Sequence, residues 1–463
     1  MTQEARSTDT IAAIATPPGS GGIGIIRISG SRSYHILNRV FHPHRPHESF
    51  LSHRLYYGTI CADDGTTLDE VLAVYMQAPK TYTTEDVVEI HCHGSHQALQ
   101  AVLGLVLCKG ARPARPGEFT QRAFLGGRID LTRAEAVVDL LTAKTQSGLH
   151  MAISQLQGEL YQQVEKIRQT LVTLLAEIEV AIDFPDDEVE IVDRKRFRDQ
   201  LVSEVEEPLQ QLILQANQGK IFREGATVVI AGRPNVGKSS LLNALLREER
   251  ALVTSVPGTT RDTIEEYITI KGVPVRLVDT AGIRDDAGTV EEMGIQRARS
   301  KLADADLVLL MLDGSRPLTA ADYDLYGLVE KRDPLLVINK IDDEDEKPAS
   351  EFLSVFPGRT RLVISAKKRL GLTALQEAIY TRLTGEEAVW DGKTCAPNTR
   401  HRAIFEKTLK ACNRLRRDLE EELPLDLAAV ELQAGLDYLA DIVGLTTPED
   451  VLDTIFAKFC LGK

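Results

Sequence analysis

The spacing of apolar residues changes along the chain, and each spacing predicts a different kind of element. In the stretch from residue 10 to about 120, short β-branched runs predict strands at 25–29 (IIRIS) and 87–91 (VVEIH). The apolar run that follows predicts a helix that ends at Gly110, because glycine is favoured just past a helix end. This mixture predicts an N-terminal domain of the α+β class.

Farther along, the pattern becomes helical. Over 153–182 the steps between apolar residues alternate between three and four, which predicts one continuous helix. A helix of that length belongs to a bundle. A second helical stretch, around 201–212, contains Pro208, which predicts a kink or break. A last helix is predicted to have Thr447 as its N-cap and Pro448 at its first position.

Strand and helix patterns alternate between about 225 and 380. Such alternation predicts a doubly wound α/β unit with a parallel sheet. Because helical patterns lie before and after this unit, we expect the two helical parts to pack together, with the α/β unit inserted between them. The strand candidates are TVVIA (227–231), VRLVD (275–279), LVLLML (307–312), LLVIN (335–339) and RLVIS (361–365).

A phosphate-binding P-loop lies at the start of the α/β unit. Gly232 is followed by four residues and then by Gly237, Lys238 and Ser239, between a predicted strand and a helical run. Backbone N–H groups of such a loop bind phosphate oxygens. Lys238 reaches the terminal phosphates, and the hydroxyl of Ser239 ligates Mg²⁺. The motif therefore predicts binding of a nucleoside triphosphate.

Three further motifs follow predicted strands and select the nucleotide. Asp279 opens DTAG (279–282), where the aspartate can hold Mg²⁺ through water and the glycine N–H can contact the γ-phosphate. Asp342 closes NKID (339–342), and its carboxylate can accept hydrogen bonds from guanine N1 and N2, which adenine does not offer. The backbone of SAK (365–367) can contact guanine O6. The set predicts GTP rather than ATP.

The group that orients the attacking water differs from that of Ras-like GTPases, because Ile283 occupies the position of their glutamine. Asn235 offers a side-chain carbonyl that, with backbone carbonyls of 254–259, can seat a monovalent cation such as K⁺. The alternative is that Asn235 only stabilises the loop by a hydrogen bond. Thr260 is the expected second Mg²⁺ ligand, and the acidic segment 285–292 is the expected source of a water-positioning group.

Composition sets bounds on the kind of protein. The 463 residues suggest about three domains, and the net charge of −14 argues against broad attraction to nucleic acid or anionic membranes. The sequence lacks an apolar run of about 18 residues and an N-terminal signal core. We therefore expect a cytoplasmic protein without membrane insertion, with six reduced cysteines. Basic clusters at 112–133 and 400–417 are expected to be solvated helix faces.

Two other patterns are discounted on local grounds. Residues 19–24 fit GxGxxG, but they open a β-patterned run, whereas a dinucleotide-binding fingerprint opens a helix. We therefore expect a hairpin or tight loop there. His91, Cys92 and His93 resemble metal ligands, but alternation along a strand puts Cys92 on the opposite face. We interpret them as strand residues.

Several segments together carry a resemblance that covers essentially the whole chain. They are DTIAAIATPPGSGGIGIIRISG, ARPGEFTQRAFLGGRIDLTRAEAVVDL, AIDFPDDE, PNVGKSS, GTTRD and the terminal FCLGK. With them the chain resembles the MnmE/TrmE tRNA modification GTPases. The resemblance implies a folate-binding and dimerisation domain (1–125), a helical-bundle domain in two segments (126–222 and 385–463) and an inserted Ras-like P-loop GTPase domain (223–384).

The resemblance also implies roles for individual residues. Catalysis is expected from Glu291, which positions water, with Lys238 and Asn235. The implied ligands are Ser239 and Thr260 for Mg²⁺, and Asn235, Thr254, Val256 and Thr259 for K⁺. The implied contacts of a tetrahydrofolate derivative, in its 5-formyl or methylene form, are Arg27, Glu89, Arg128 and Lys463. The implied GTP contacts are Asn235, Val236, Gly237, Lys238, Ser239, Ser240, Thr254, Ser255, Val256, Pro257, Gly258, Thr259, Thr260, Asp279, Thr280, Ala281, Gly282, Asn339, Lys340, Asp342, Ser365, Ala366 and Lys367.

One departure from the family pattern and one open alternative concern the folate side of this resemblance. Arg128 stands where a lysine is common, so the cation is kept but its geometry changes. Cys460, in the terminal FCLGK, is either a reactive thiol or a neighbour of the folate.

The resemblance finally implies partners. These are a second copy of the chain, the flavoprotein MnmG and tRNA, on which the two proteins add a carboxymethylaminomethyl-type group to C5 of the wobble uridine. Two other classes share part of the pattern. A ribosome-assembly GTPase shares the nucleotide motifs but usually carries an RNA-binding module such as a KH domain. A non-catalytic folate-binding scaffold shares only the N-terminal features, and the intact Mg²⁺ and guanine motifs argue against it.

Overall fold

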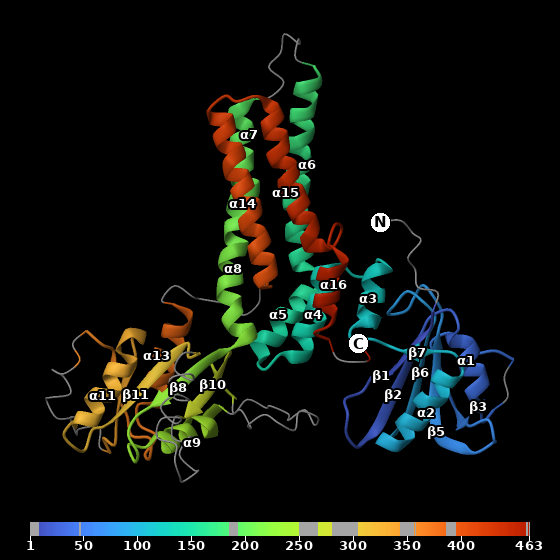
Figure 1. Cartoon of the computed structure of the whole chain (residues 1–463), viewed down its shortest axis with the longest axis horizontal. Helices are drawn as coiled ribbons and strands as arrows, with labels where there is room; N and C mark the ends of the chain where they lie inside the picture. Colours follow the sequence, from blue (N-terminus) through green and yellow to red (C-terminus); the bar gives the residue numbers. More distant parts are fainter. Residues whose placement is uncertain are drawn as a thin grey trace.

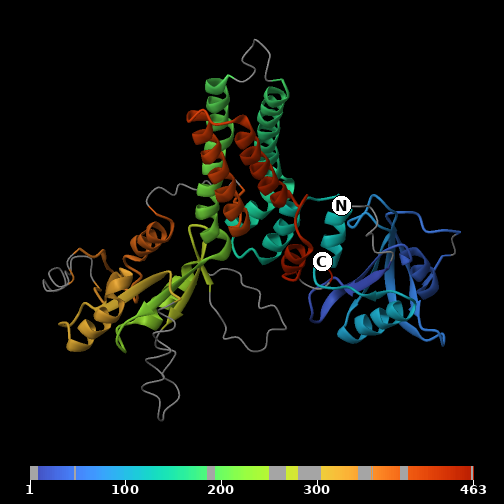
Figure 2. The same cartoon turned by 45° about the horizontal axis from the view of Figure 1, so that its top comes forward.

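A tall bundle of helices stands between two sheet-containing parts of the molecule (Figure 1). The C-terminal end lies beside the N-terminal sheet in both views (Figures 1 and 2). None of the described helices combines the length and apolar character that a membrane span needs. The structure is a computed structural model that describes residues 9–45, 48–184, 193–249, 267–279, 304–342, 356, 358–385, 395–459 and 462.

The N-terminal part is a seven-stranded sheet in the order β3-β4-β5-β6-β2-β1-β7, with two helices on one face. In β2, Ile26 and Ile28 are buried in a core shared with these helices, whereas Ile25 and Arg27 alternate with them on the other face. The expected α+β class is confirmed. The elements are β1 (Ile11–Ile14), β2 (Gly21–Ser29), α1 (Ser33–Val40), β3 (Phe41–Pro43), β4 (Arg54–Cys61), β5 (Thr67–Met76), β6 (Val87–Gly94), α2 (His96–Cys108), β7 (Arg112–Pro113) and α3 (Glu118–Leu125).

The two patterns that were discounted as ligand sites belong to strands. The glycine-rich run at 19–24 leads into β2 and opens no helix, as expected. In β6, Cys92 is buried and His93 is exposed, so the alternation expected for these residues is confirmed.

Helices from both sides of the α/β unit pack into one bundle, with α6 against α15 and α8 against α14. Their apolar stripes meet in a single core. The helices are α4 (Leu131–Thr142), α5 (Gln146–Gln157), α6 (Glu159–Asp183), α7 (Arg194–Leu201), a π-helical turn (Val202–Glu206), α8 (Glu207–Glu224), α14 (Thr399–Glu420), α15 (Leu425–Val443) and α16 (Glu449–Phe456).

The continuous helix predicted over 153–182 is wrong. Gly158 separates α5 from α6 and adopts a left-handed conformation with φ of 93°. This left-handed conformation favours glycine, which has no Cβ, and the guanidinium of Arg133 lies against it. The chain changes direction there although the apolar spacing continues without a break.

The boundaries near Pro208 and Thr447 test two local predictions. The helix is not broken at Pro208: the π-helical turn continues without a gap into α8, and the proline lies in the first turn of that helix. The predicted cap of the last helix is wrong: Pro448 is the N-cap of α16. The hydroxyl of Thr447 instead donates to the carbonyl of Asp441 at 3.0 Å, which ties α16 to the end of α15.

The α/β unit contains a six-stranded sheet in the order β13-β12-β11-β8-β10-β9, in which the β9–β10 pair alone is antiparallel. The doubly wound arrangement is confirmed. The start of β8 follows the end of α8 after one residue, so the edge opposite the nucleotide motifs faces the bundle. The elements are β8 (Ala226–Ala231), α9 (Lys238–Glu249), β9 (Tyr267–Ile270), β10 (Val273–Asp279), β11 (Leu307–Asp313), α11 (Ala320–Val329), a 3-10 turn (Glu330–Arg332), β12 (Leu335–Asn339), β13 (Arg361–Val363) and α13 (Leu372–Thr384).

The basic segment 112–133 is not simply a solvated helix face, contrary to expectation. Arg122 is 7% exposed and its Nη2 lies 2.7 Å from Asp9 and 3.1 Å from Glu118. Arg112 donates to the other Glu118 oxygen at 2.9 Å. Burial alone would raise the pKa of Glu118, but hydrogen bonds from Arg112 and Arg122 lower it from 4.5 to about 2.

Glu118→Gln is expected to destabilise the N-terminal part by about 3 kcal/mol at pH 7. Because the folded-state pKa lies below the unfolded-state value, the stabilisation by Glu118 is complete above about pH 5 and is lost as the pH falls toward 2. Urea unfolding of the wild type and the variant at pH 7 and pH 3 measures this. An equal difference at both pH values would contradict the assignment.

Candidate functional site

The P-loop joins the end of β8 to the start of α9. Gly237 has φ of 103°, and a Cβ there would lie 2.3 Å from Nδ2 of Asn339. Glycine therefore lets the loop backbone approach the neighbouring motif. Asn235 has φ of 65° and is exposed. The loop and the N-terminus of α9 together present backbone N–H groups to an anion.

The ammonium group of Lys238 is held by the loop itself. Lys238 is 5% exposed, and its Nζ donates to the carbonyls of Gly232 and Arg233, both at 2.9 Å. Arg233 in turn donates to the buried carboxylate of Asp322 at 2.7 Å. The Arg233–Asp322 pair has no local sequence signal, because its two members come from a loop and a helix far apart in the chain.

A hydroxyl and a carboxylate meet beside the loop. The Oγ of Ser239 lies 3.5 Å from Oδ2 of Asp279, the last residue of β10. Both are hard oxygen donors, which suit Mg²⁺. The structure thus brings together two of the residues expected from sequence at the metal site.

The motifs predicted to bind the base form one hydrogen-bonded unit. Asn339 donates through Nδ2 to the carbonyl of Val236 at 2.8 Å and accepts from the backbone N–H of Ala366 at 3.0 Å. The Oγ of Ser365 donates to Oδ1 of Asp342 at 2.7 Å. Asn339 therefore fixes the SAK loop relative to the P-loop, and Ser365 orients the carboxylate that would face guanine.

Lys340 lies beside this unit. Its Nζ pairs with Asp313 at the end of β11 at 2.6 Å. The pKa of Asp313 is lowered: burial raises it, but the hydrogen bonds from Lys340 and Ser315 lower it more. The pair holds the lysine stem at the edge of the sheet where the base would lie.

A second cluster lies on the N-terminal sheet. Arg27 and Glu89 face each other across β2 and β6 and form an ion pair of 2.8 Å. The guanidinium groups of Arg27 and Arg128 lie 5.9 Å and 5.5 Å from the centroid of the Tyr82 ring. Phe119 lies 5.7 Å from the Arg27 guanidinium. Three predicted folate contacts therefore come together, and two aromatic rings that carried no sequence signal lie among them.

The C-terminal segment reaches this second cluster. The Nη1 of Arg27 donates to the carbonyl of Gly462 at 3.2 Å. A Cβ at Gly462 would lie 2.4 Å from the carbonyl oxygen of Ile14, so the segment approaches the sheet closely. Residues distant in the chain thus meet at one place.

Comparison with known proteins decides the family. Residues 10–128 match the model of the GTP-binding protein TrmE N-terminus, and residues 131–460 match that of the MnmE helical domain. A tRNA modification GTPase MnmE of Desulfotalea psychrophila is 55% identical over 459 residues, which are 98% of each chain. The chain belongs to the MnmE family.

Two further comparisons show the range of similarity to this MnmE family member. The tRNA modification GTPase MnmE of Natranaerobius thermophilus is 42% identical over 98% of this chain and 99% of its own. Among solved structures, the G domain of the T. maritima FeoB iron transporter is 30% identical; the match covers 34% of this chain and 98% of that one, with a TM-score of 0.26.

Part of the site predicted for this MnmE family member lies outside the described residues. These predictions stay predictions. They concern the loop before β9, the DTAG motif after its aspartate, the water-positioning carboxylate and two residues at the C-terminus. The residues are Thr254, Ser255, Val256, Pro257, Gly258, Thr259, Thr260, Thr280, Ala281, Gly282, Glu291, Cys460 and Lys463.

Proposed function

We propose that this chain hydrolyses GTP and uses the reaction in modifying the wobble uridine of certain tRNAs. The observation that carries the proposal is the convergence of Lys238, Ser239, Asp279 and Asn339 at one edge of a parallel sheet, in a chain of the MnmE family. Lys238 contacts the terminal phosphates, and Asp342 reads the base. Ser239 and Thr260 hold Mg²⁺, with Asp279 acting through water. The metal supplies charge that stabilises the phosphate oxygens during transfer.

The proposed catalytic device includes a monovalent cation. Asn235, Thr254, Val256 and Thr259 hold K⁺, whose charge replaces that of an arginine finger. The exposed Asn235 supports this, because its side chain stands at the phosphate loop of a site that lacks the usual glutamine. Glu291 positions the attacking water. The GTPase domains of two copies of the chain approach each other face to face when GTP and K⁺ are bound.

GTP turnover is expected to be at least about tenfold faster in K⁺ than in Na⁺ at equal ionic strength, because the smaller ion fits these ligands poorly. Steady-state phosphate release from the purified chain measures this. Asn235→Ala should remove the difference between the two salts. Equal rates for the wild type in both salts would reject the cation role.

The second cluster is proposed to bind a tetrahydrofolate derivative that supplies a one-carbon unit. Arg27 and Arg128 bring positive charge, Glu89 brings a carboxylate, and Tyr82 brings an aromatic face for a flat heterocycle. Lys463 completes the set. This chemistry suits a ligand that has a pterin ring and carboxylates. Cys460 belongs to the same proposal, either as a reactive thiol or as a neighbour of the ligand.

The proposed partners are a second copy of the chain, MnmG and tRNA. Support for the second copy comes from the face of the N-terminal sheet that α1 and α2 leave uncovered. Leu55, Tyr57 and Leu72 are 51%, 48% and 40% exposed there, on the neighbouring strands β4 and β5. The proposed domains keep the boundaries 1–125, 126–222 with 385–463, and 223–384.

Mass spectrometry of tRNA nucleosides from cells that lack this protein tests the function. We expect the C5 modification of the wobble uridine to be absent and to return when the wild-type chain is supplied. The Asp342→Asn variant should not restore it, because it cannot select GTP. Unchanged wobble uridines would reject the proposal and favour a GTPase of ribosome assembly.

A further inference from the structure

Helix α4 contacts the two places where the chain passes between the bundle and the GTPase part: the end of α8, at Arg223, and the start of α14, at Arg400. These are called the outgoing link and the return link. Helix α4 also contacts α16, which leads to the C-terminus. Glu135 and Asp139 lie four residues apart and so share one face of α4. Leu131, Ala134 and Val137 belong to an apolar cluster with α16. Leu131 lies one turn before Glu135, so the apolar residues and the two carboxylates lie on adjoining faces of the helix, and they contact different parts of the molecule.

The first carboxylate holds the start of α14. Glu135 is 9% exposed and accepts hydrogen bonds from Nε and Nη2 of Arg400, both at 2.9 Å. Its Oε2 also lies 2.7 Å from Nε2 of His401. Arg400 further donates to the carbonyl of Asp441, near the end of α15, at 3.0 Å. Because α14 is the first bundle helix after the GTPase part, Glu135 holds the return link of the chain.

His401 is locked in one tautomer by the cap of α14. The backbone N–H of Asn398 donates to Nδ1 of His401 at 3.1 Å, so that nitrogen is an acceptor and carries no proton. The ring proton is therefore on Nε2 and points to Glu135. Burial lowers the pKa of His401 and keeps the ring neutral. The ring is a rigid spacer between α4 and the first turn of α14.

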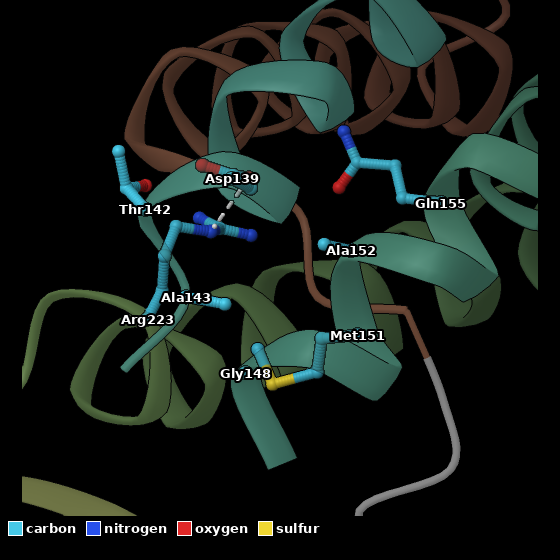
Figure 3. A pocket seen from close by; sticks show the side chains of 8 residues that line it. All are labelled: Asp139, Thr142, Ala143, Gly148, Met151, Ala152, Gln155 and Arg223. Atoms are coloured by element: carbon cyan, nitrogen blue, oxygen red, sulfur yellow. Dashed lines mark ion pairs between the residues drawn. The ribbon is translucent and has the colours of Figure 1, made fainter. Parts of the chain in front are cut away.

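The second carboxylate holds the outgoing link. Asp139 pairs with Nε of Arg223 at 3.0 Å (Figure 3), and Arg223 lies in the last turn of α8, just before β8. Arg223 also donates to the carbonyl of Ala396 on the return link. Asp139 and Arg223 both line a cavity of about 10 Å³, which has room for about one water. Figure 3 shows them among the side chains that surround it. Both chain crossings are thus tied to one face of α4.

The β9–β10 hairpin contacts the corner between α4 and α5. The Nζ of Lys144 lies 3.8 Å from the centroid of the Tyr267 ring, and a Cβ at Gly272 would lie 2.3 Å from Oγ of Ser147. Met151 of α5 belongs to the same core as the hairpin strands. The other end of β10 is Asp279, beside Ser239 of the phosphate site. A single paired strand therefore spans the distance from the phosphate site to this corner.

The apolar face of α4 connects to the folate-side cluster. Leu131 and Val137 pack with Leu452, Phe456 and Phe459. Phe456 and Phe459 also lie close to Gly117, the N-cap of α3, since a Cβ there would lie 2.6 Å from the Phe456 carbonyl oxygen and 3.1 Å from Cβ of Phe459. Three residues beyond Phe459, the carbonyl of Gly462 accepts the hydrogen bond from Arg27. The apolar face of α4 thus connects through α16 and Phe459 to the region where Gly462 meets Arg27.

We propose that α4 couples nucleotide binding to folate binding, with Glu135 and Asp139 as positioning residues that tie the helix to the two links of the GTPase part. The inference rests on the proposed function and names the path of its regulation. The partners described for the two carboxylates are Arg400, His401 and Arg223, which lie outside the phosphate site and the folate-side cluster, so loss of the carboxylates should weaken the coupling and leave each separate binding event intact.

The test measures the affinity of the full-length protein for 5-formyltetrahydrofolate with and without a non-hydrolysable GTP analogue, in K⁺ and Mg²⁺. In the wild type, the analogue is expected to change this affinity about tenfold. In Asp139→Asn and in Glu135→Gln the ratio should approach one, while the affinity for each ligand alone stays within about twofold. Glu431→Gln is the matched control, because it breaks the α14–α15 pair with Arg414 (2.8 Å) and spares α4.

A third variant, at the exposed corner between α4 and α5, tests the same path without changing a buried side chain, so the protein is expected to remain folded. Lys144 is exposed, and Lys144→Gln removes its contact with Tyr267, so it should lower the coupling ratio about twofold or more. A wild-type ratio in all three α4-side variants, or a ratio of one in the wild type, overturns the inference. Absence of any folate binding by the wild type rejects the proposed function itself, and the inference with it.

Discussion

Lys238→Ala is expected to reduce GTP turnover by about 10²–10³-fold. The ammonium group is held within the P-loop by the carbonyls of Gly232 and Arg233, so it is already oriented before the phosphates arrive. Its removal takes away a fixed positive charge where negative charge develops. Phosphate release at saturating GTP, with nucleotide affinity measured separately, divides the loss between binding and turnover.

Lys331→Ala is the matched control for that measurement. Lys331 is an exposed lysine of the same α/β unit, in the 3-10 turn after α11. Its loss should leave turnover within about twofold of the wild type. If Lys238→Ala kept wild-type turnover, the P-loop would not be the site of hydrolysis.

Asp342→Asn is expected to weaken GTP binding by at least about 10²-fold and to improve binding of xanthosine triphosphate. The carboxylate accepts two hydrogen bonds from guanine, whereas the amide of asparagine would place a donor against the guanine amino group. Xanthine carries a carbonyl there and accepts that donor. Competition between the two nucleotides for the wild type and the variant measures the change of preference.

Ser365→Ala separates base recognition from loop stability. The Ser365 hydroxyl donates to Asp342 at 2.7 Å, and its loss should weaken GTP binding modestly without changing the preferred base. A variant Asp342→Asn that lost both nucleotides equally would show that Asp342 supports the loop and does not read the base.

Local patterns predicted the elements whose signals are local. The P-loop, the Asp279 position and the Asn339 and Asp342 motif lie at strand ends as expected, because phosphate binding needs particular residues at fixed spacing. Periodicity failed at Gly158, where one left-handed residue turns the chain while the apolar stripe continues in phase. The cap prediction failed at Thr447 because the hydroxyl of Thr447 donates a hydrogen bond to the backbone carbonyl of Asp441, which lies on α15.

The sequence by itself determined the nucleotide class, the α/β unit and the helical nature of the segments around it, since each depends on neighbours along the chain. Only the tertiary structure decided which distant residues meet. Arg27 and Arg128 both lie near the Tyr82 ring, and Glu135 holds Arg400 and His401, without any pattern that links them in sequence. Burial makes such contacts specific, because a charge removed from water is stable only where the fold supplies its partner.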